Sequence, residues 1–139
     1  MTGNNFSKPM AGLCRWAMRA ALAGLTFSAV VHASTFVAPV SLDTALPLHF
    51  GAIILGVPMV VVASVASQGQ TGVSLWTFLQ ACPPWLRYGA VGLTGYALIN
   101  LFLLFTGQIS DLQGMSAVWQ CGYASIAAVY HAVGKRQVA

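Results

Sequence analysis

The chain has 139 residues, of which 58% are hydrophobic and only 6% are charged, and its formal net charge is +4. A soluble domain carries about 25% charged residues, so this composition excludes an ordinary water-exposed globular surface. A lipid bilayer tolerates it, because hydrocarbon requires only that backbone polar groups be paired within the structure. No polar stretch is long enough for a second domain, and residues 1–139 are therefore expected to form a single membrane domain.

Taken in chain order, the long uncharged stretches predict four membrane-spanning helices. Asp43 alone interrupts the stretch between Arg19 and Arg87, and Asp111 alone interrupts the next one. Each aspartate lies among turn-forming residues. Cutting at these turns gives spans at about 20–38, 45–66, 85–106 and 115–134, each close to the ~20 residues that cross a bilayer. The predicted fold class is all-α, a polytopic membrane protein built as a four-transmembrane-helix bundle.

The segment between the second and third spans predicts a short interfacial helix. Residues 73–82 are apolar on both sides, too short to span, and followed by Pro83-Pro84, which end a helix. Such a helix lies along the membrane surface. Trp16, Trp76 and Trp85 are then expected to form an aromatic belt at the cytoplasmic interface.

The basic residues predict the orientation. With four spans and the N-terminus inside, all the basic residues fall on the cytoplasmic side and both aspartates fall in outer loops, which gives an N-in/C-in protein of the bacterial inner (plasma) membrane. Because the basic residues are spread over the ends of apolar runs, they form no patch for nucleic acid, and their expected partner is the lipid bilayer. They are Lys8, Arg15, Arg19, Arg87, Lys135 and Arg136.

An alternative concerns the first 33 residues, which resemble a signal peptide. They have a basic start, an apolar stretch over 20–31 and a small-residue cleavage site at 31–33. Cleavage there would leave three spans with the same orientation. The apolar character continues through Phe36 and Val37, so an uncleaved first helix is favoured.

Small and polar residues within the spans predict which helix faces pack together. Small residues at four-residue spacing let two backbones approach closely, and polar ones face the bundle to escape lipid. The first span carries such a stripe on one face: Ala20, Gly24, Ser28 and His32. Gly56 and Gly92 mark similar stripes in the second and third spans.

Four side chains are expected to meet in the outer half of the bundle: His32, His49, Asn100 and Trp119. Two interpretations stay open. In the first, each imidazole bonds to a neighbouring helix and holds the bundle together. In the second, His32 and His49 bind a cofactor between them, either as axial ligands of haem b or as hydrogen-bond partners of a quinone headgroup.

The sequence carries no catalytic or metal-binding pattern. No carboxylate lies within a predicted span, which disfavours a carboxylate-driven proton or cation relay. A Ser/His/Asp order, an HExxH motif and a P-loop are all missing. Two histidines without a third ligand make a poor zinc site, so neither an enzyme nor a resident metal is expected.

Several short motifs resemble those of a family of small uncharacterised bacterial four-helix inner-membrane proteins, over about residues 30–130. They are Val31-His32-x-x-Thr35-Phe36, Leu48-His49-x-Gly51, Pro84-Trp85, Tyr96-Ala97-x-x-Asn100 and Trp119. Members carry a His just before the Trp of the last helix, where this chain has Val118. The resemblance therefore implies the architecture, but it implies neither a shared metal or haem site nor a reaction.

The leading functional hypothesis is a non-enzymatic membrane protein without a cofactor, which serves as a small subunit or partner of a larger membrane complex or associates with itself. The alternative is a redox-associated component that binds haem b or quinone through His32 and His49. A third is an oligomeric carrier or channel, since four short helices enclose little pore alone.

Overall fold

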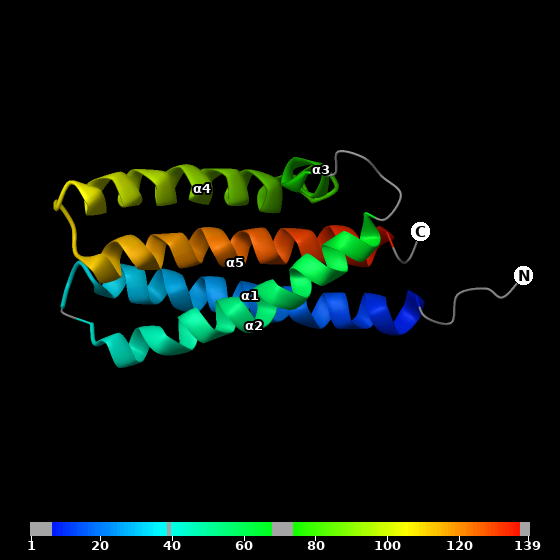
Figure 1. Cartoon of the computed structure of the whole chain (residues 1–139), viewed down its shortest axis with the longest axis horizontal. Helices are drawn as coiled ribbons and strands as arrows, with labels where there is room; N and C mark the ends of the chain where they lie inside the picture. The colour runs from blue at the N-terminus through cyan, green and yellow to red at the C-terminus, as the bar shows by residue number, and fades with distance from the viewer. Residues whose placement is uncertain (1–6, 39, 68–73, 137–139) are drawn as a thin grey trace, which may run out of the picture.

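The computed structural model describes residues 7–38, 40–67 and 74–136, and these ranges contain helices and turns but no strand. The helices are α1 (Ser7–Ser34), α2 (Leu42–Ala66), the short α3 (Leu75–Gln80), α4 (Pro84–Phe105) and α5 (Asp111–Arg136). Figure 1 shows the four long helices side by side, with α5 between α4 on one side and α1 and α2 on the other. The chain is an all-α helical bundle.

The long helices coincide with the predicted segments, with one large difference at the N-terminus. α1 begins at Ser7 rather than near residue 20, because Arg15 and Arg19 are good helix formers that prolong the helix beyond its apolar part. The short helix predicted over 73–82 is α3, which buries Phe78 and Leu79 and leaves Trp76 exposed. Residue 73 itself lies outside the described ranges.

Contacts around α5 set the directions of the helices. Tyr123 and Tyr130 of α5 donate hydrogen bonds to the backbone carbonyls of Leu48 and Leu55 of α2, at 2.7 and 3.0 Å. Tyr130 lies seven residues after Tyr123, and its partner Leu55 lies seven residues after Leu48, so α2 and α5 run parallel. The end of α1 meets the start of α5, and the start of α1 meets the end of α5, so these two helices are antiparallel. α4 and α5 are antiparallel in the same way, and the long helices alternate up and down.

α5 is enclosed by its neighbours, whereas α2 and α4 are not. Five alanines of α5 are at most 1% exposed, namely Ala117, Ala124, Ala127, Ala128 and Ala132. By length and composition, two described helices could cross a membrane, at Asp43–Ala66 and Pro84–Phe105, and only 6% and 17% of their most apolar parts are buried. α1 and α5 are long enough but not apolar enough to be counted as candidate spans, because cations and small or polar residues lower their mean hydropathy. The structure therefore identifies two candidate spans among the four predicted.

Tyr123 is clamped between the backbones of α1 and α2. A Cβ built at Gly24 would overlap its ring, with 2.7 Å to Cδ1 and to Cζ, and a Cβ at Gly51 would lie 2.5 Å from its hydroxyl. Glycine at these two positions permits the close approach of three helices. Gly92 of α4 differs, because a Cβ there would meet no atom within 4 Å.

We predict that Gly24→Ala destabilises the bundle by about 1–3 kcal/mol, since the added methyl group must displace a buried ring. Gly92→Ala is the matched control, and it should leave the free energy of unfolding unchanged or raise it by up to about 1 kcal/mol through helix propensity. The measurement is unfolding of the purified protein by SDS titration, followed by circular dichroism. Equal effects of the two substitutions would contradict the clamped ring.

Candidate functional site

A buried polar cluster joins α1, α4 and α5 where α1 ends. His32 is 6% exposed, its Nδ1 lies 2.7 Å from Ser116 Oγ, and its Nε2 is hydrogen-bonded to Tyr96 Oη. The rings of Phe36 and Tyr96 meet the imidazole edge-on, with centroids 5.2 and 5.4 Å away. One turn earlier, Ser28 Oγ donates to the backbone carbonyl of Ser116 at 3.1 Å. A single histidine therefore links three helices.

The donors and acceptors of this cluster define one proton arrangement. Ser116 Oγ donates to the Gln113 carbonyl at 2.9 Å, which uses its only proton, so it accepts from Nδ1–H of His32. Nε2 of His32 then carries the lone pair and accepts a hydrogen bond from the Tyr96 hydroxyl. The result is a neutral imidazole with both nitrogens engaged, in a chain that runs from Tyr96 through His32 and Ser116 to Gln113.

The other three candidate residues lie outside this chain. Asn100 is 4% exposed, and its Nδ2 donates at 2.9 Å to the carbonyl of Tyr96, one turn earlier on α4. Trp119 is 8% exposed and meets the His49 ring edge-on at 6.3 Å. In the described part of the chain no contact joins His32 to His49. His32 faces α4 and α5, whereas His49 lies at the α2–α5 boundary.

His49 opens onto an apolar groove between α2 and α5. It lines two hollows of ≈ 390 and ≈ 370 Å³ that share His49 and Trp119 as walls. Its ring contacts are with Phe50 and Trp119, and among the described residues it has no hydrogen-bond partner. The polar atoms of this imidazole are therefore available to a group from outside the chain.

The predicted packing residues are placed as follows. Gly24 and Ser28 contact α5, and a Cβ at Gly56 would make an ordinary 3.6 Å contact with the same helix. Ala20 and Gly92 are exposed. A helix turns once in 3.6 residues, so residues spaced by four are gradually rotated around the helix axis. Ala20 therefore no longer faces α5, whereas Gly24 and Ser28 do.

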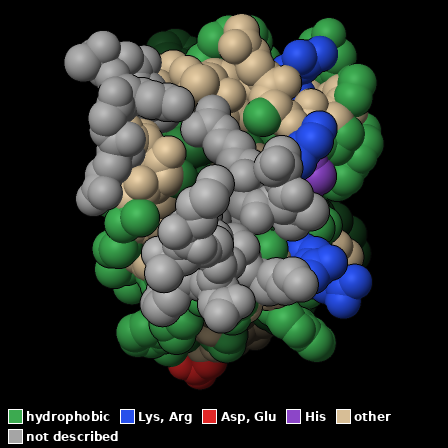
Figure 2. Space-filling model, turned by 90° about the vertical axis from the view of Figure 1, so that its right-hand side faces the viewer, with side chains coloured by type: hydrophobic (Ala, Val, Ile, Leu, Met, Phe, Trp, Pro, Cys, Tyr) green, Lys and Arg blue, Asp and Glu red, His purple; other side chains and the backbone are tan. Residues whose placement is uncertain are grey.

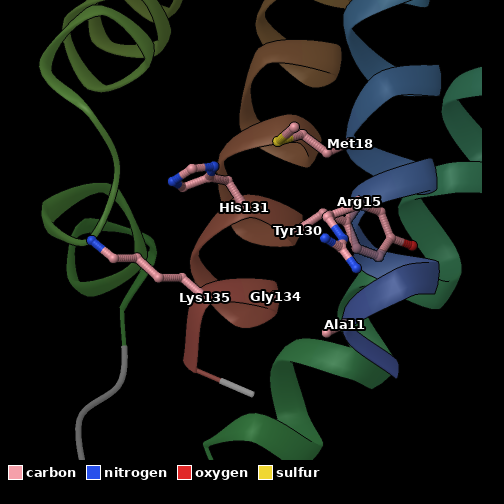
Figure 3. Close-up of a pocket in the computed structure, with 7 residues that line it drawn as sticks. All are labelled: Ala11, Arg15, Met18, Tyr130, His131, Gly134 and Lys135. Carbon is pink, nitrogen blue, oxygen red and sulfur yellow. The ribbon is translucent and has the colours of Figure 1, made fainter. Parts of the chain in front are cut away.

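Sequence reasoning missed a basic groove at the opposite end of the bundle. It lies between α1 and α5, has a volume of ≈ 260 Å³, and is lined by Arg15, His131 and Lys135 around an apolar floor. Figure 2 views the molecule from this end and shows lysine and arginine side chains on it. In Figure 3, Arg15 comes from α1, while His131 and Lys135 project from α5. The sequence did contain a signal for this groove. Basic residues lie near the start of α1 and near the end of α5, and these two ends meet when the helices pack antiparallel.

Cys82 lies at this end as well and is closed to solvent, with 6% exposure. Its Sγ donates to the carbonyls of Phe78 and Ala128, at 3.4 and 3.2 Å. Burial raises the pKa of the Cys82 thiol, and the positive charges of Arg87 and Lys135 oppose this only in part. The thiol therefore stays protonated at neutral pH and fastens the end of α3 to α5.

The residues present fit some ligands better than others. Among the described residues no group of three His, Cys, Asp or Glu could hold a metal ion. Haem ligation by both histidines fits poorly, because each nitrogen of His32 is already hydrogen-bonded. A quinone headgroup needs only one donor beside an aromatic wall, and His49 with Trp119 supplies both.

Comparisons of the chain with protein-family models, with curated proteins and with solved structures gave no match. The function therefore has to follow from the contacts, burial and charges of its own residues.

We predict that His32 and Tyr96 are energetically coupled. In a double-mutant cycle of His32→Ala and Tyr96→Phe, the coupling free energy should lie between about 0.6 and about 1.7 kcal/mol, the mean and the maximum found for hydrogen bonds between membrane helices. Tyr88→Phe replaces Tyr96→Phe in the control cycle, because Tyr88 is 66% exposed on the same helix. The effects of the two control substitutions should be additive. Additivity in both cycles would contradict the hydrogen bond between His32 and Tyr96.

Proposed function

We propose that the chain is a non-enzymatic multi-pass protein of the bacterial inner membrane, four spans with both termini in the cytoplasm, which serves as a small subunit or partner of a larger membrane complex. One observation carries this proposal. α2 and α4 are long enough to cross hydrocarbon, and the bundle buries only 6% and 17% of their most apolar parts. Apolar surface on this scale requires lipid or another protein around it.

The composition of α1 and α5 is compatible with spanning because the bundle covers their polar groups. With 28 and 26 residues, they reach about 42 and 39 Å at ~1.5 Å per residue, beyond the ~30 Å of hydrocarbon. Ser28, His32 and Ser116 are buried and hydrogen-bonded. Arg15 and Arg19 extend α1 past the apolar part, where long side chains reach the headgroups.

The charges and the tryptophans support one orientation. Asp43 and Asp111 stand in the first turns of α2 and α5, at the end of the bundle opposite the start of α1 and the end of α5 in Figure 1. Trp16, Trp76 and Trp85 are 71%, 53% and 63% exposed at the other end, as an interfacial belt requires. The end that carries the basic groove is therefore assigned to the cytoplasm.

The topology is tested with reporter fusions in bacteria. Alkaline phosphatase should be active after Val40 and after Gln108, and green fluorescent protein should fluoresce after Ser67 and after Arg136. This pattern follows if all four long helices cross the membrane. Reporters that place Ser67 and Arg136 on opposite faces of the membrane would contradict the proposal. So would a protein that is recovered in the soluble fraction of lysed cells without detergent.

His49 favours a partner rather than lipid alone at the α2–α5 groove. An imidazole without a hydrogen bond is costly at bilayer depth, and His49 lies within α2, beyond its first turn. A hydroxyl or carbonyl from a neighbouring helix in the groove would satisfy it. Trp119 and Gly56 then offer a flat wall and a gap for that helix.

The same groove favours a second candidate function, quinone binding. A headgroup carbonyl could accept a hydrogen bond from His49, its ring could pack on Trp119, and its tail could follow the apolar floor along Ile53 and Val57. This version needs His49 alone and leaves the hydrogen bonds of His32 intact.

We predict that His49→Leu removes whatever co-purifies with the wild-type protein in mild detergent. Mass spectrometry of the purified sample distinguishes a partner protein from an extracted quinone, and the absorption spectrum detects haem. Tyr88→Phe, an exposed position on α4, is the control and should retain the bound species. If the His49→Leu sample keeps the same partner or quinone at the same stoichiometry, the groove is not the binding site.

A further inference from the structure

The basic groove between α1 and α5 is not used by the proposed function. Arg15 stands on the α1 side, and His131 and Lys135 stand on the α5 side, around Met18 and Tyr130 (Figure 3). Its ≈ 260 Å³ exceeds the ~30 Å³ that one water occupies by several-fold. The groove is therefore large enough for a group of phosphate size with part of its attached chain.

No protein anion neutralises these cations within the described residues. The two aspartates begin α2 and α5, at the far end of the bundle. Other cations at the same end have aromatic partners, since Arg19 lies 5.8 Å from the Trp16 ring centroid and Arg87 lies 4.9 Å from that of Tyr88. Arg15 and Lys135 make no hydrogen bond, ion pair or aromatic contact in the described part of the chain.

The shape of the groove combines charge and apolar surface. Gly134 brings the two helices together, because a Cβ there would lie 3.1 Å from Cys14 Cβ. Met18 and the ring of Tyr130 line the hollow between the cationic rims. In Figure 3 the Lys135 side chain extends from α5 to the side away from Arg15. Both side chains are long and exposed, so a change of rotamer would let each reach an anion over the apolar floor.

We propose that this groove binds the phosphodiester of an anionic phospholipid from the cytoplasmic leaflet, with Arg15 and Lys135 on the phosphate oxygens and Met18 against the glycerol and upper acyl chain. The inference rests on the proposed membrane orientation, which places this end of the bundle at that leaflet. Basic pockets between membrane helices on the cytoplasmic side are established sites for anionic headgroups.

The test is native mass spectrometry of the full-length protein released from detergent micelles that contain phosphatidylglycerol or phosphatidylcholine. The wild-type protein should retain phosphatidylglycerol in preference. Arg15→Gln and Lys135→Gln should each weaken its binding by about five-fold, the effect of one basic residue near an anionic surface. Arg19→Gln removes an equal charge from the same helix but from outside this groove, and it should weaken the binding less than either of them.

Three results would overturn the site. They are equal retention of both lipids, an equal loss in Arg19→Gln, and displacement of the bound lipid by millimolar inorganic phosphate, which would identify a soluble phosphate as the ligand. Circular dichroism and size-exclusion chromatography should be unchanged in the variants, because Arg15 and Lys135 are exposed. The reporter fusions test the orientation separately, so a correct topology without lipid preference rejects only the groove.

Discussion

The bundle depends on the close burial of α5 among its three long neighbours. α5 is rich in alanine and glycine and carries hydroxyl and amide groups, so it is the helix least suited to face hydrocarbon by itself. Its small residues let the other helices approach, and Tyr123 and Tyr130 then reach the α2 carbonyls of Leu48 and Leu55. These bonds fix the parallel register of α2 and α5, while Gly24 and Gly51 provide the space that the Tyr123 ring needs.

The same packing gives His32 and His49 different chemistry. His32 is turned into the α1–α4–α5 junction, where Tyr96 and Ser116 use both of its nitrogens, so its role is to hold helices together. His49 belongs to α2, the less buried of the two candidate spans, and it retains its hydrogen-bonding capacity on the bundle surface. Of the two, only His49 can recognise a partner without loss of an internal contact.

The sequence predicted the helices better than the directions of their side chains. Charge gaps and turn residues located the long helices and α3, because the boundaries of apolar segments are a one-dimensional property. The meeting of His32 with Ser116, and the separation of His32 from His49, depend on how each helix is rotated about its axis. Tyr123 carried no sequence signal, since an aromatic residue in an apolar helix resembles any other core residue. The groove of Arg15 and Lys135 is formed by residues far apart in the sequence, and it exists only once α1 and α5 have packed together.

That pairing also bears on the alternative with three spans. A chain cut after Ala33 would lose Gly24, Ser28 and His32, and with them the partners of Tyr123 and Ser116 on α5. Both residues are at most 2% exposed in the bundle. The Tyr123 hydroxyl would keep its bond to Leu48 and Ser116 Oγ its bond to Gln113, but the Tyr123 ring and the Ser116 carbonyl would lose the α1 groups that cover them. The cut would also remove one rim of the basic groove. In the proposed membrane topology, α1 is therefore the helix that shields these groups of α5 from lipid.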